Sequence, residues 1–437
     1  MRVLIAGGGI GGLTLALTLH QCGIACRVSE AAPAVKPLGV GINILPHSVG
    51  EFASLGLLPQ LDRIAIRTRT LTYANHLGQE IWSEPRGLHA GYDVPQFSIH
   101  RGLLRDLLWE TATERLGPEQ VRADERLVDY WQDANRVVAR FASASGATED
   151  VEGDVLIGAD GIHSWLRAAL HPRDPGIRWT GIKMWRGATY WPTFDGGDAM
   201  VIAGDTVSKL ILYPIAPGRT GDERLTNWVI TALVADPDSP PPQRESWSRR
   251  GRYEEFDHLV QRLQLPFVDV TQLIRSTDEI FEYPMCDRDP LPFWTLGRVT
   301  LLGDAAHPMY PVGSNGASQA ALDARCLTRF LATRPTTEAL TAYEAERLAA
   351  TAAIVRSNRV GGPERVMDMI AVRAPDGFDR IDDVMSKAEL DTISKQYATL
   401  AGFAVASQQS GLGASVIDDM PDHDARGISN RPNPKPR

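Results

Sequence analysis

The sequence predicts an α/β protein: a Rossmann-like domain, an antiparallel sheet inserted into it, and helices that follow. A strand, a glycine turn, a helix and a second strand succeed one another within residues 1–30. Between residues 181 and 282, short segments rich in Trp, Tyr, Val and Ile alternate with turns rich in Pro and Asp, as in antiparallel sheets. Long helical segments from about residue 314 predict the C-terminal helices.

The composition limits the classes of protein to which this chain can belong. The 437 residues are 43% hydrophobic and 23% charged, which is typical of a globular protein of two or three domains. A net charge of −9 without a basic block argues against a nucleic-acid partner. No apolar run has the length of a membrane span, and the first strand starts at Arg2, so we expect no signal peptide and a cytoplasmic location. The four cysteines form no C-x-x-C pair, so we expect reduced, structural thiols and no metal site.

The first motif has a physical role for each residue type. Residues 3–6 form an apolar strand, 13–22 a helix and 27–29 the next strand. Gly7 permits a tight turn, Gly9 lets the backbone approach a pyrophosphate, and Gly12 lets the helix lie close to the strand. The helix N-terminus offers N–H groups to the phosphates, and Glu30 can accept hydrogen bonds from a ribose. The pattern predicts a bound dinucleotide and does not distinguish FAD from NAD.

The remaining elements follow from local pattern. A loop over 31–41 precedes a helix over 48–55, and segments 69–76 and 80–83 form a hairpin. An amphipathic helix covers 102–115, strands cover 127–131, 137–141 and 154–158, and the inserted sheet has strands at 184–190, 199–203, 209–213 and 225–234. A buried strand at 299–302 precedes helices over 314–333 and 337–358, and the polar, Pro-rich end from 410 to 437 is expected to be mobile.

This pattern divides the chain into three parts. Residues 1–75, 98–180 and 283–365 form the discontinuous nucleotide-binding domain, and residues 76–97 and 181–282 form the β-sheet substrate domain. Residues 366–437 form a C-terminal helical segment and tail.

Two further motifs lie at predicted strand ends, where ligands bind in open α/β sheets. The first, GADGIHS, carries Asp160 and Gly161, and the second, LLGDAAH, carries Gly303 and Asp304. Asp304 is placed to accept hydrogen bonds from ribityl hydroxyls, and the helix beginning near Ser314 directs its N–H groups at an electron-rich ring edge. A capping role for Asp304 and a turn-forming role for Asp160 are the alternatives, which the three motifs together disfavour.

With these motifs, the chain resembles the flavin-dependent aromatic hydroxylases of the p-hydroxybenzoate hydroxylase fold. Within that family it is most similar to the 5-methylphenazine-1-carboxylate 1-monooxygenases, with salicylate and 3-hydroxybenzoate hydroxylases as further relatives. The segments that carry this resemblance are PLGVGINI, WSEPRG, SIHRG, GADGIHS, MWRG, NWV, YPM-DRDPLP and LLGDAAH-MYP-G-NGASQA. The resemblance runs to about residue 360, so the C-terminal part inherits no role.

The resemblance implies roles position by position. The adenosine diphosphate of FAD would be held by Gly7, Gly9, Gly11, Gly12 and Glu30. The rest of FAD and the approach of the nicotinamide would involve Val40, Gly41, Arg101, Asp160, Gly161, Gly303 and Asp304. The flavin and peroxide pocket, with no side-chain base assigned, would be lined by Pro311, Gly313, Asn315 and Gly316.

The implied reaction is hydroxylation of an electron-rich, carboxylated or fused-ring aromatic with NAD(P)H and O2 through a flavin C4a-hydroperoxide. Candidate substrate contacts on the inserted sheet are Trp185, Arg186, Tyr213 and Trp228, with packing in the sheet core as the alternative for each. His307 follows the third motif and is interpreted as a structural hydrogen-bonding residue rather than a base.

The sequence leaves several points open. NADH or NADPH would act transiently, with or without decarboxylation of the substrate, and the protein would be a monomer or a homodimer. The alternatives to a hydroxylase are a flavin reductase or oxidase without oxygen insertion and a non-catalytic flavin-binding homologue.

Overall fold

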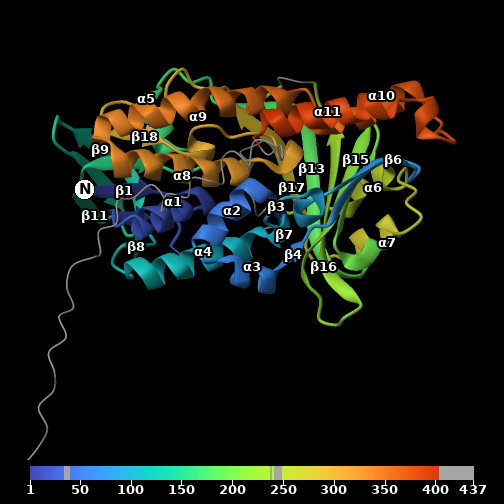
Figure 1. The fold of residues 1–437 in the computed structure, drawn as a ribbon, viewed down its shortest axis with the longest axis horizontal. Helices are drawn as coiled ribbons and strands as arrows, with labels where there is room; N and C mark the ends of the chain where they lie inside the picture. The colour runs from blue at the N-terminus through green and yellow to red at the C-terminus, as the bar shows by residue number, and fades with distance from the viewer. Residues whose placement is uncertain (34–39, 237–238, 241–248, 403–437) are drawn as a thin grey trace, which may run out of the picture.

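The computed structural model describes residues 1–33, 40–236, 239–240 and 249–402. The predicted tail over 410–437 and the middle of the predicted loop, residues 34–39, lie outside these ranges. The described residues form a parallel α/β part and a large sheet that lie side by side (Figure 1).

A five-stranded sheet forms the centre of the α/β part, and every strand pair in it is parallel. The buried residues of β1 lie between β12 and β2, so the first motif starts from the middle of the core. The predicted strand–helix–strand unit is confirmed, with α1 between the first two strands. In order across the sheet, the strands are β18 (Val299–Leu301), β12 (Val155–Gly158), β1 (Arg2–Ala6), β2 (Ala25–Ser29) and β8 (Val121–Arg122).

Helices cover this sheet because their apolar faces join its core. Helix α1 (Ile10–Gln21) contacts both α8 (Gly316–Thr333) and α4 (Arg101–Leu116), and α8 contacts α9 (Thr336–Arg359). Buried leucines of α1, α4 and α8 belong to one cluster with the strands. Smaller elements of this part are α2 (Pro46–Ser54), α3 (Leu58–Ile64), α5 (Trp165–Leu170), β9 (Arg126–Gln132), β10 (Val137–Ala142) and β11 (Thr148–Gly153).

The second sheet has seven strands and is antiparallel except for the parallel pair β14–β5. The predicted inserted sheet is therefore confirmed, and β5, β6 and β17 extend it beyond residues 181–282. The domain limits at 75/76 and 282/283 stay predictions. In order, the strands are β17 (Phe281–Arg288), β13 (Ile177–Pro192), β16 (Glu223–Leu233), β15 (Ser208–Pro217), β14 (Ala199–Gly204), β5 (Thr70–Asn75) and β6 (Glu80–Pro85).

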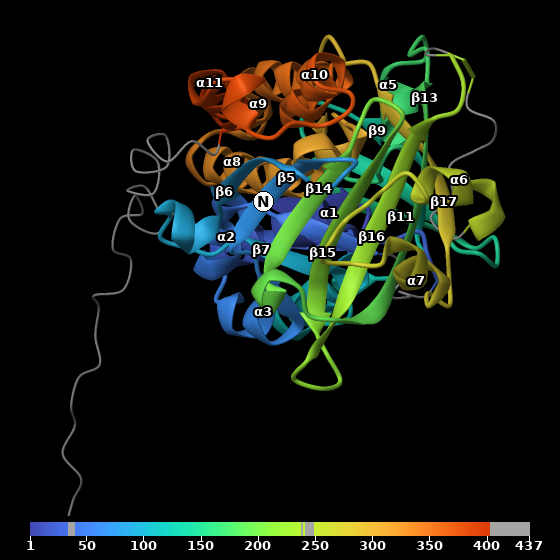
Figure 2. The same ribbon diagram turned by 90° about the vertical axis from the view of Figure 1, so that its right-hand side faces the viewer.

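Different helices pack on the two faces of this sheet. Helices α6 (Asp257–Val260) and α7 (Val270–Arg275) share an apolar cluster with one face. Helices α10 (Arg365–Arg373) and α11 (Lys387–Leu400) share another cluster with the opposite face. Figure 2 shows the strands side by side, with α10 and α11 at one end of the sheet.

A third sheet joins the two parts, with β7 (Phe97–His100) between β3 (Gly41–Ile44) and β4 (Ala65–Arg67). Among the residues described, no helix combines the length and the apolar character that crossing a membrane requires.

Candidate active site

A continuous cavity of about 1060 Å³ lies between the two parts of the molecule. One wall contains the residues that follow β1, β2, β12 and β18, where the carboxyl ends of parallel strands leave a crevice. The opposite wall is one face of the seven-stranded sheet. All three sequence motifs therefore meet in one cavity.

The glycine turn brings backbone to the cavity without side chains. Gly7 has φ +116°, and a Cβ there would lie 2.2 Å from the Ala159 carbonyl oxygen. A Cβ on Gly12 would lie 2.1 Å from the Gly7 oxygen, so Gly12 serves close packing and does not line the cavity. Gly9 differs because a Cβ there would have no atom within 4 Å in the part of the chain that the structure describes. No side chain caps α1 at Gly9, so its first N–H groups are available to an anion in the cavity.

Glu30 lies at the cavity wall beside this turn. Its carboxylate accepts hydrogen bonds from the backbone N–H groups of Gly8, at 2.7 Å, and Ala32, at 3.0 Å. Arg105 places Nη2 3.6 Å from Glu30 Oε1 and donates from Nε to the Gly8 oxygen. Sequence reasoning missed Arg105, although its spacing of four residues from Arg101 puts both on one face of a helix.

Asp160 and Gly161 line the cavity after β12. Asp160 Oδ2 accepts from the N–H groups of Trp165, at 2.8 Å, and Leu166, at 3.3 Å, so it also holds the start of α5. Its Oδ1 is buried and has no hydrogen-bond partner within the described chain, and burial raises the pKa of this carboxyl. Asp160 therefore combines a local structural role, which the sequence analysis had disfavoured, with an oxygen that is left for a ligand.

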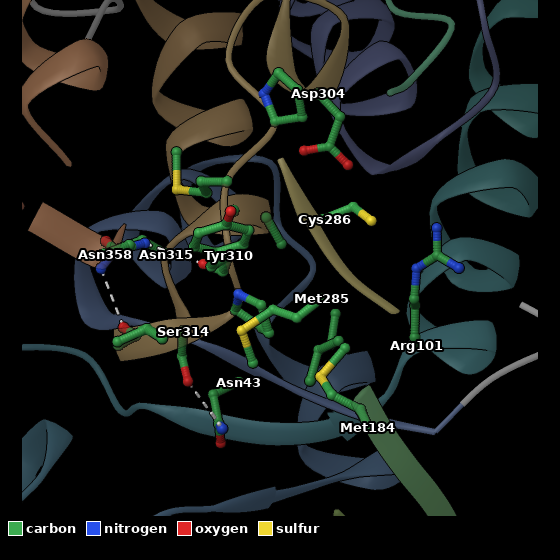
Figure 3. A pocket seen from close by; sticks show the side chains of 18 of the residues that line it. Asn43, Arg101, Met184, Met285, Cys286, Asp304, Tyr310, Ser314, Asn315 and Asn358 are labelled. Carbon is green, nitrogen blue, oxygen red and sulfur yellow. Dashed lines mark hydrogen bonds between the residues drawn. The ribbon is translucent and has the colours of Figure 1, made fainter. Parts of the chain in front are cut away.

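Asp304 follows β18 and faces the cavity together with Arg101 of α4 (Figure 3). Burial raises the pKa of Asp304, while the positive charges of His307 and Arg101 act to lower it. Desolvation lowers the pKa of Arg101, and Asp304 opposes it. The preceding Gly303 has φ +60°, which turns the chain so that Asp304 points inward. The pair offers an acceptor and a cation to one ligand.

The loop after the third motif is built from an unusual backbone. Pro311, Gly313, Asn315 and Gly316 all line the cavity. Gly313 and Ser314 have φ +67° and +58°, and positive φ is costly for a residue such as serine. Asn43 of β3 donates to Ser314 Oγ at 3.3 Å (Figure 3), and this contact was not predicted.

The first residue of β3 and the residue before it contact the sheet wall and α4. Gly41 lines the cavity, and a Cβ there would lie 2.6 Å from atoms of Tyr213 and Ile215. Val40 is 3% exposed and does not line the cavity, and its carbonyl oxygen accepts from the Arg101 N–H at 3.1 Å.

The wall formed by the sheet shows the expected alternation of side chains. Arg186 of β13 and Tyr213 of β15 line the cavity. Trp185 and Trp228 lie on the other face, where Trp185 stacks on Phe256 with ring centres 5.0 Å apart. The structure therefore does not bring these two tryptophans to the cavity, because adjacent strand residues point to opposite faces.

His307 belongs to a buried network behind the cavity and does not line it. Its Nε2 donates to Asp323 Oδ2 at 2.6 Å, and Arg347 donates from Nε to Asp323 Oδ1 at 2.7 Å. The Gly303 N–H donates to the same carboxylate at 3.1 Å. This geometry agrees with the structural role predicted for His307.

FAD fits the donors and acceptors that line this cavity. The Gly9 turn offers room and N–H groups for a pyrophosphate, and Glu30, Asp160 and Asp304 offer carboxylate oxygens for hydroxyl groups along the same cavity. The cavity continues past the loop at Gly313 to the sheet, which leaves space for a second ligand.

Comparison with known proteins agrees with this assignment. Residues 1–358 match the family model described as FAD binding domain. The chain is 44% identical over 363 residues to phenazine 1,6-dicarboxylic acid hydroxylase PhzS of Lysobacter antibioticus, covering 82% of this chain and 89% of that protein. It is 31% identical over 369 residues to 3-hydroxybenzoate 6-hydroxylase 1 of Aquipseudomonas alcaligenes, covering 82% and 88%.

A solved structure shows the same fold. HpxO of Klebsiella pneumoniae, complexed with FAD and uric acid, superposes with a TM-score of 0.67 at 22% identity and covers 95% of this chain and 97% of its own. The chain belongs to the FAD binding domain family and is an FAD-dependent aromatic hydroxylase.

Proposed function

We propose that this protein hydroxylates a carboxylated, fused-ring aromatic of the phenazine type, with NAD(P)H as reductant and O2 as oxidant. The similarity to the phenazine dicarboxylic acid hydroxylase over most of both chains carries this proposal. One oxygen atom would enter the ring and the other would leave as water, with two electrons from NAD(P)H. In this proposal the protein acts in the cytoplasm as a monomer or a homodimer, with NADH or NADPH as the reductant and with or without decarboxylation of the substrate.

The cavity wall on the sheet suits a flat aromatic molecule. Its side chains are mostly apolar and come from alternate positions of neighbouring strands: Leu71, Met200, Ile202, Ile211 and Tyr213. Burial of such a ring against these side chains would supply most of the binding free energy. An aromatic with two or three fused rings would use this wall better than a small polar substrate.

Arg186 supports recognition of a carboxylate. It lines the cavity beside Gly41, to whose oxygen Nη2 donates at 3.4 Å. Burial away from water lowers the pKa of Arg186 to about 10, and the positive charge of Arg101 acts in the same direction. The Arg186 guanidinium is still positively charged at neutral pH, because neutral pH is well below this pKa.

Bound FAD would supply the redox and oxygen-transfer chemistry. The chain's own residues would hold it through the Gly9 turn, Asp160 and Asp304, and would place the substrate against the sheet. The loop at Gly313 and Asn315 borders the space between the two ligands, where it would exclude water from the reacting ring.

The test is NADH and NADPH oxidation by FAD-loaded protein with phenazine carboxylates, salicylate, hydroxybenzoates and anthranilate, following product mass and H2O2 together. A phenazine carboxylate that accelerates oxidation and gains one oxygen supports the proposal. Oxidation that yields only H2O2 with every compound would point to a reductase or oxidase, and no reduction of bound FAD would point to a flavin-binding protein without activity.

Replacing Arg186 with glutamine is expected to raise KM for a carboxylated substrate at least about tenfold, since a charge-assisted hydrogen bond contributes about 1.5–3 kcal/mol. The KM of an analogue without the carboxylate should change little. Arg219→Gln is the matched control, because Arg219 stacks on Tyr190 and does not line the cavity. Equal changes in KM for both analogues would contradict a carboxylate contact at Arg186.

A further inference from the structure

Helix α11 reaches the active-site cavity from a part of the chain beyond the family match, which ends at residue 358. Its Tyr397 lines the cavity and is 5% exposed. The helix is anchored on both sides of this residue, since Leu390 and Ile393 pack into the cluster on the sheet and Ala401 packs with Leu45. Tyr397 is therefore held by a docked helix.

The hydroxyl group of Tyr397 joins three segments. It accepts a hydrogen bond from Asn315 Nδ2 at 2.8 Å. It lies 2.9 Å from Asn358 Oδ1 and 3.2 Å from the Val312 carbonyl oxygen, either of which can accept its proton. Asn358 Nδ2 in turn donates to the Tyr310 oxygen at 3.0 Å. Both ends of the 310–315 loop are thus connected to one hydroxyl.

The ring of Tyr397 fits between two glycines. A Cβ on Gly313 would lie 2.1 Å from the Tyr397 hydroxyl oxygen and 2.5 Å from ring carbons. A Cβ on Gly362 would lie 3.2 Å from the opposite ring edge. Both glycines have positive φ, +67° and +49°, so the backbone curves around the ring. No other residue type could occupy position 313 without moving the ring.

A second group holds the same loop. Glu364, just after the family match, lines the cavity and accepts a hydrogen bond from the Gly313 backbone N–H. The Asn315 amide also donates to the Gly313 oxygen at 3.0 Å. The positive φ values of Gly313 and Ser314 require such support, because that conformation is intrinsically costly for Ser314.

We infer that Tyr397 is a positioning residue of the hydroxylase, which holds the Pro311–Asn315 loop in its active conformation through Asn315 and Asn358. Only the expected effect of Tyr397 on hydroxylation rests on the proposed function, and its role in holding the loop does not. Burial raises the pKa of Tyr397 well above its usual value, so the phenol stays protonated and acts by hydrogen bonding rather than as a base. A loosened loop would admit water to the reacting ring, and reducing equivalents would then be lost as H2O2.

The test is Tyr397→Phe, which keeps the ring between the glycines and removes the hydroxyl. In the FAD-free protein, amide hydrogen exchange at residues 312–316 should accelerate at least about tenfold, while exchange in α11 stays unchanged. With FAD and substrate, the variant should oxidise NAD(P)H with product yield per NAD(P)H at least halved and with a matching rise in H2O2.

Tyr343→Phe is the control, because this tyrosine is 0% exposed and its hydroxyl donates to the Leu301 oxygen at 3.1 Å, away from the loop. Unchanged loop exchange in Tyr397→Phe, or equal uncoupling in both variants, would overturn the inference. If wild-type protein hydroxylates no compound, the proposed function fails, and the exchange measurement still decides the role of Tyr397.

Discussion

Replacing Gly9 with alanine is expected to weaken FAD binding at least about tenfold and to leave the folded protein intact. Gly9 has extended backbone angles, φ −82° and ψ −178°, which alanine adopts without strain. An added Cβ meets no atom of the described residues within 4 Å, because it points into the space assigned to the pyrophosphate. The free energy of unfolding of FAD-free protein should change by less than about 1 kcal/mol. Fluorescence titration with FAD and urea unfolding measure the two quantities.

Gly12→Ala is the matched control, which should differ from Gly9→Ala in its effect on stability. Its Cβ would lie 2.1 Å from the Gly7 oxygen, so the turn and α1 must move apart. We expect it to lower the free energy of unfolding of FAD-free protein by about 1–3 kcal/mol, in addition to weakening FAD binding. Wild-type FAD affinity in Gly9→Ala would show that the pyrophosphate does not approach this turn.

Asp323→Asn is expected to lower the free energy of unfolding by about 3 kcal/mol, because it leaves Arg347 and His307 buried without their carboxylate. Asp323 is 0% exposed and also accepts from the Gly303 N–H, so the turn that carries Asp304 should loosen and FAD affinity should fall. Urea unfolding with and without FAD measures both effects. Asp150→Asn, at an exposed pair with Arg140, is the control and should change little.

The same substitution predicts a pH dependence. Although burial acts in the opposite direction, the charges of His307 and Arg347 lower the pKa of Asp323 to about 2. A carboxyl whose pKa is lower in the folded state contributes stability above its unfolded value of about 3.9, and this is lost as the pH falls toward 2. The stability difference between wild type and Asp323→Asn should therefore shrink as the pH falls from about 5 toward 2. A difference that grows on acidification would contradict the ion pair.

Local sequence pattern predicted most of the fold and the nucleotide half of the cavity, because glycine turns and strand ends are fixed by short-range geometry. It predicted Gly7, Gly9, Asp160 and Asp304 at one site, and the cavity brings them together. It was less informative for the sheet wall, where neighbouring residues such as Trp185 and Arg186 face opposite sides and the sequence does not say which side meets the ligand.

Long-range contacts were beyond the sequence pattern. Nothing in residues 387–400 indicates that Tyr397 contacts Asn315, 82 positions earlier, since an amphipathic helix shows only that one face is buried. Asn43 and Ser314 are likewise 271 positions apart. Such contacts depend on how helices and strands pack against one another. The periodicity of hydrophobic residues within one element does not indicate which other element it packs against.

The parallel pairing of β14 with β5 has a consequence for how the protein is made. Strand β5 is synthesised more than a hundred residues before β14, and the five-stranded sheet is complete only when β18 emerges. Neither sheet can be completed until its later strands have been synthesised, so the edge of β5 that pairs with β14 stays unpaired on the ribosome until then. The inserted segment, residues 181–282, would lack β5, β6 and nearly all of β17 if expressed by itself, so we expect it not to form the complete sheet.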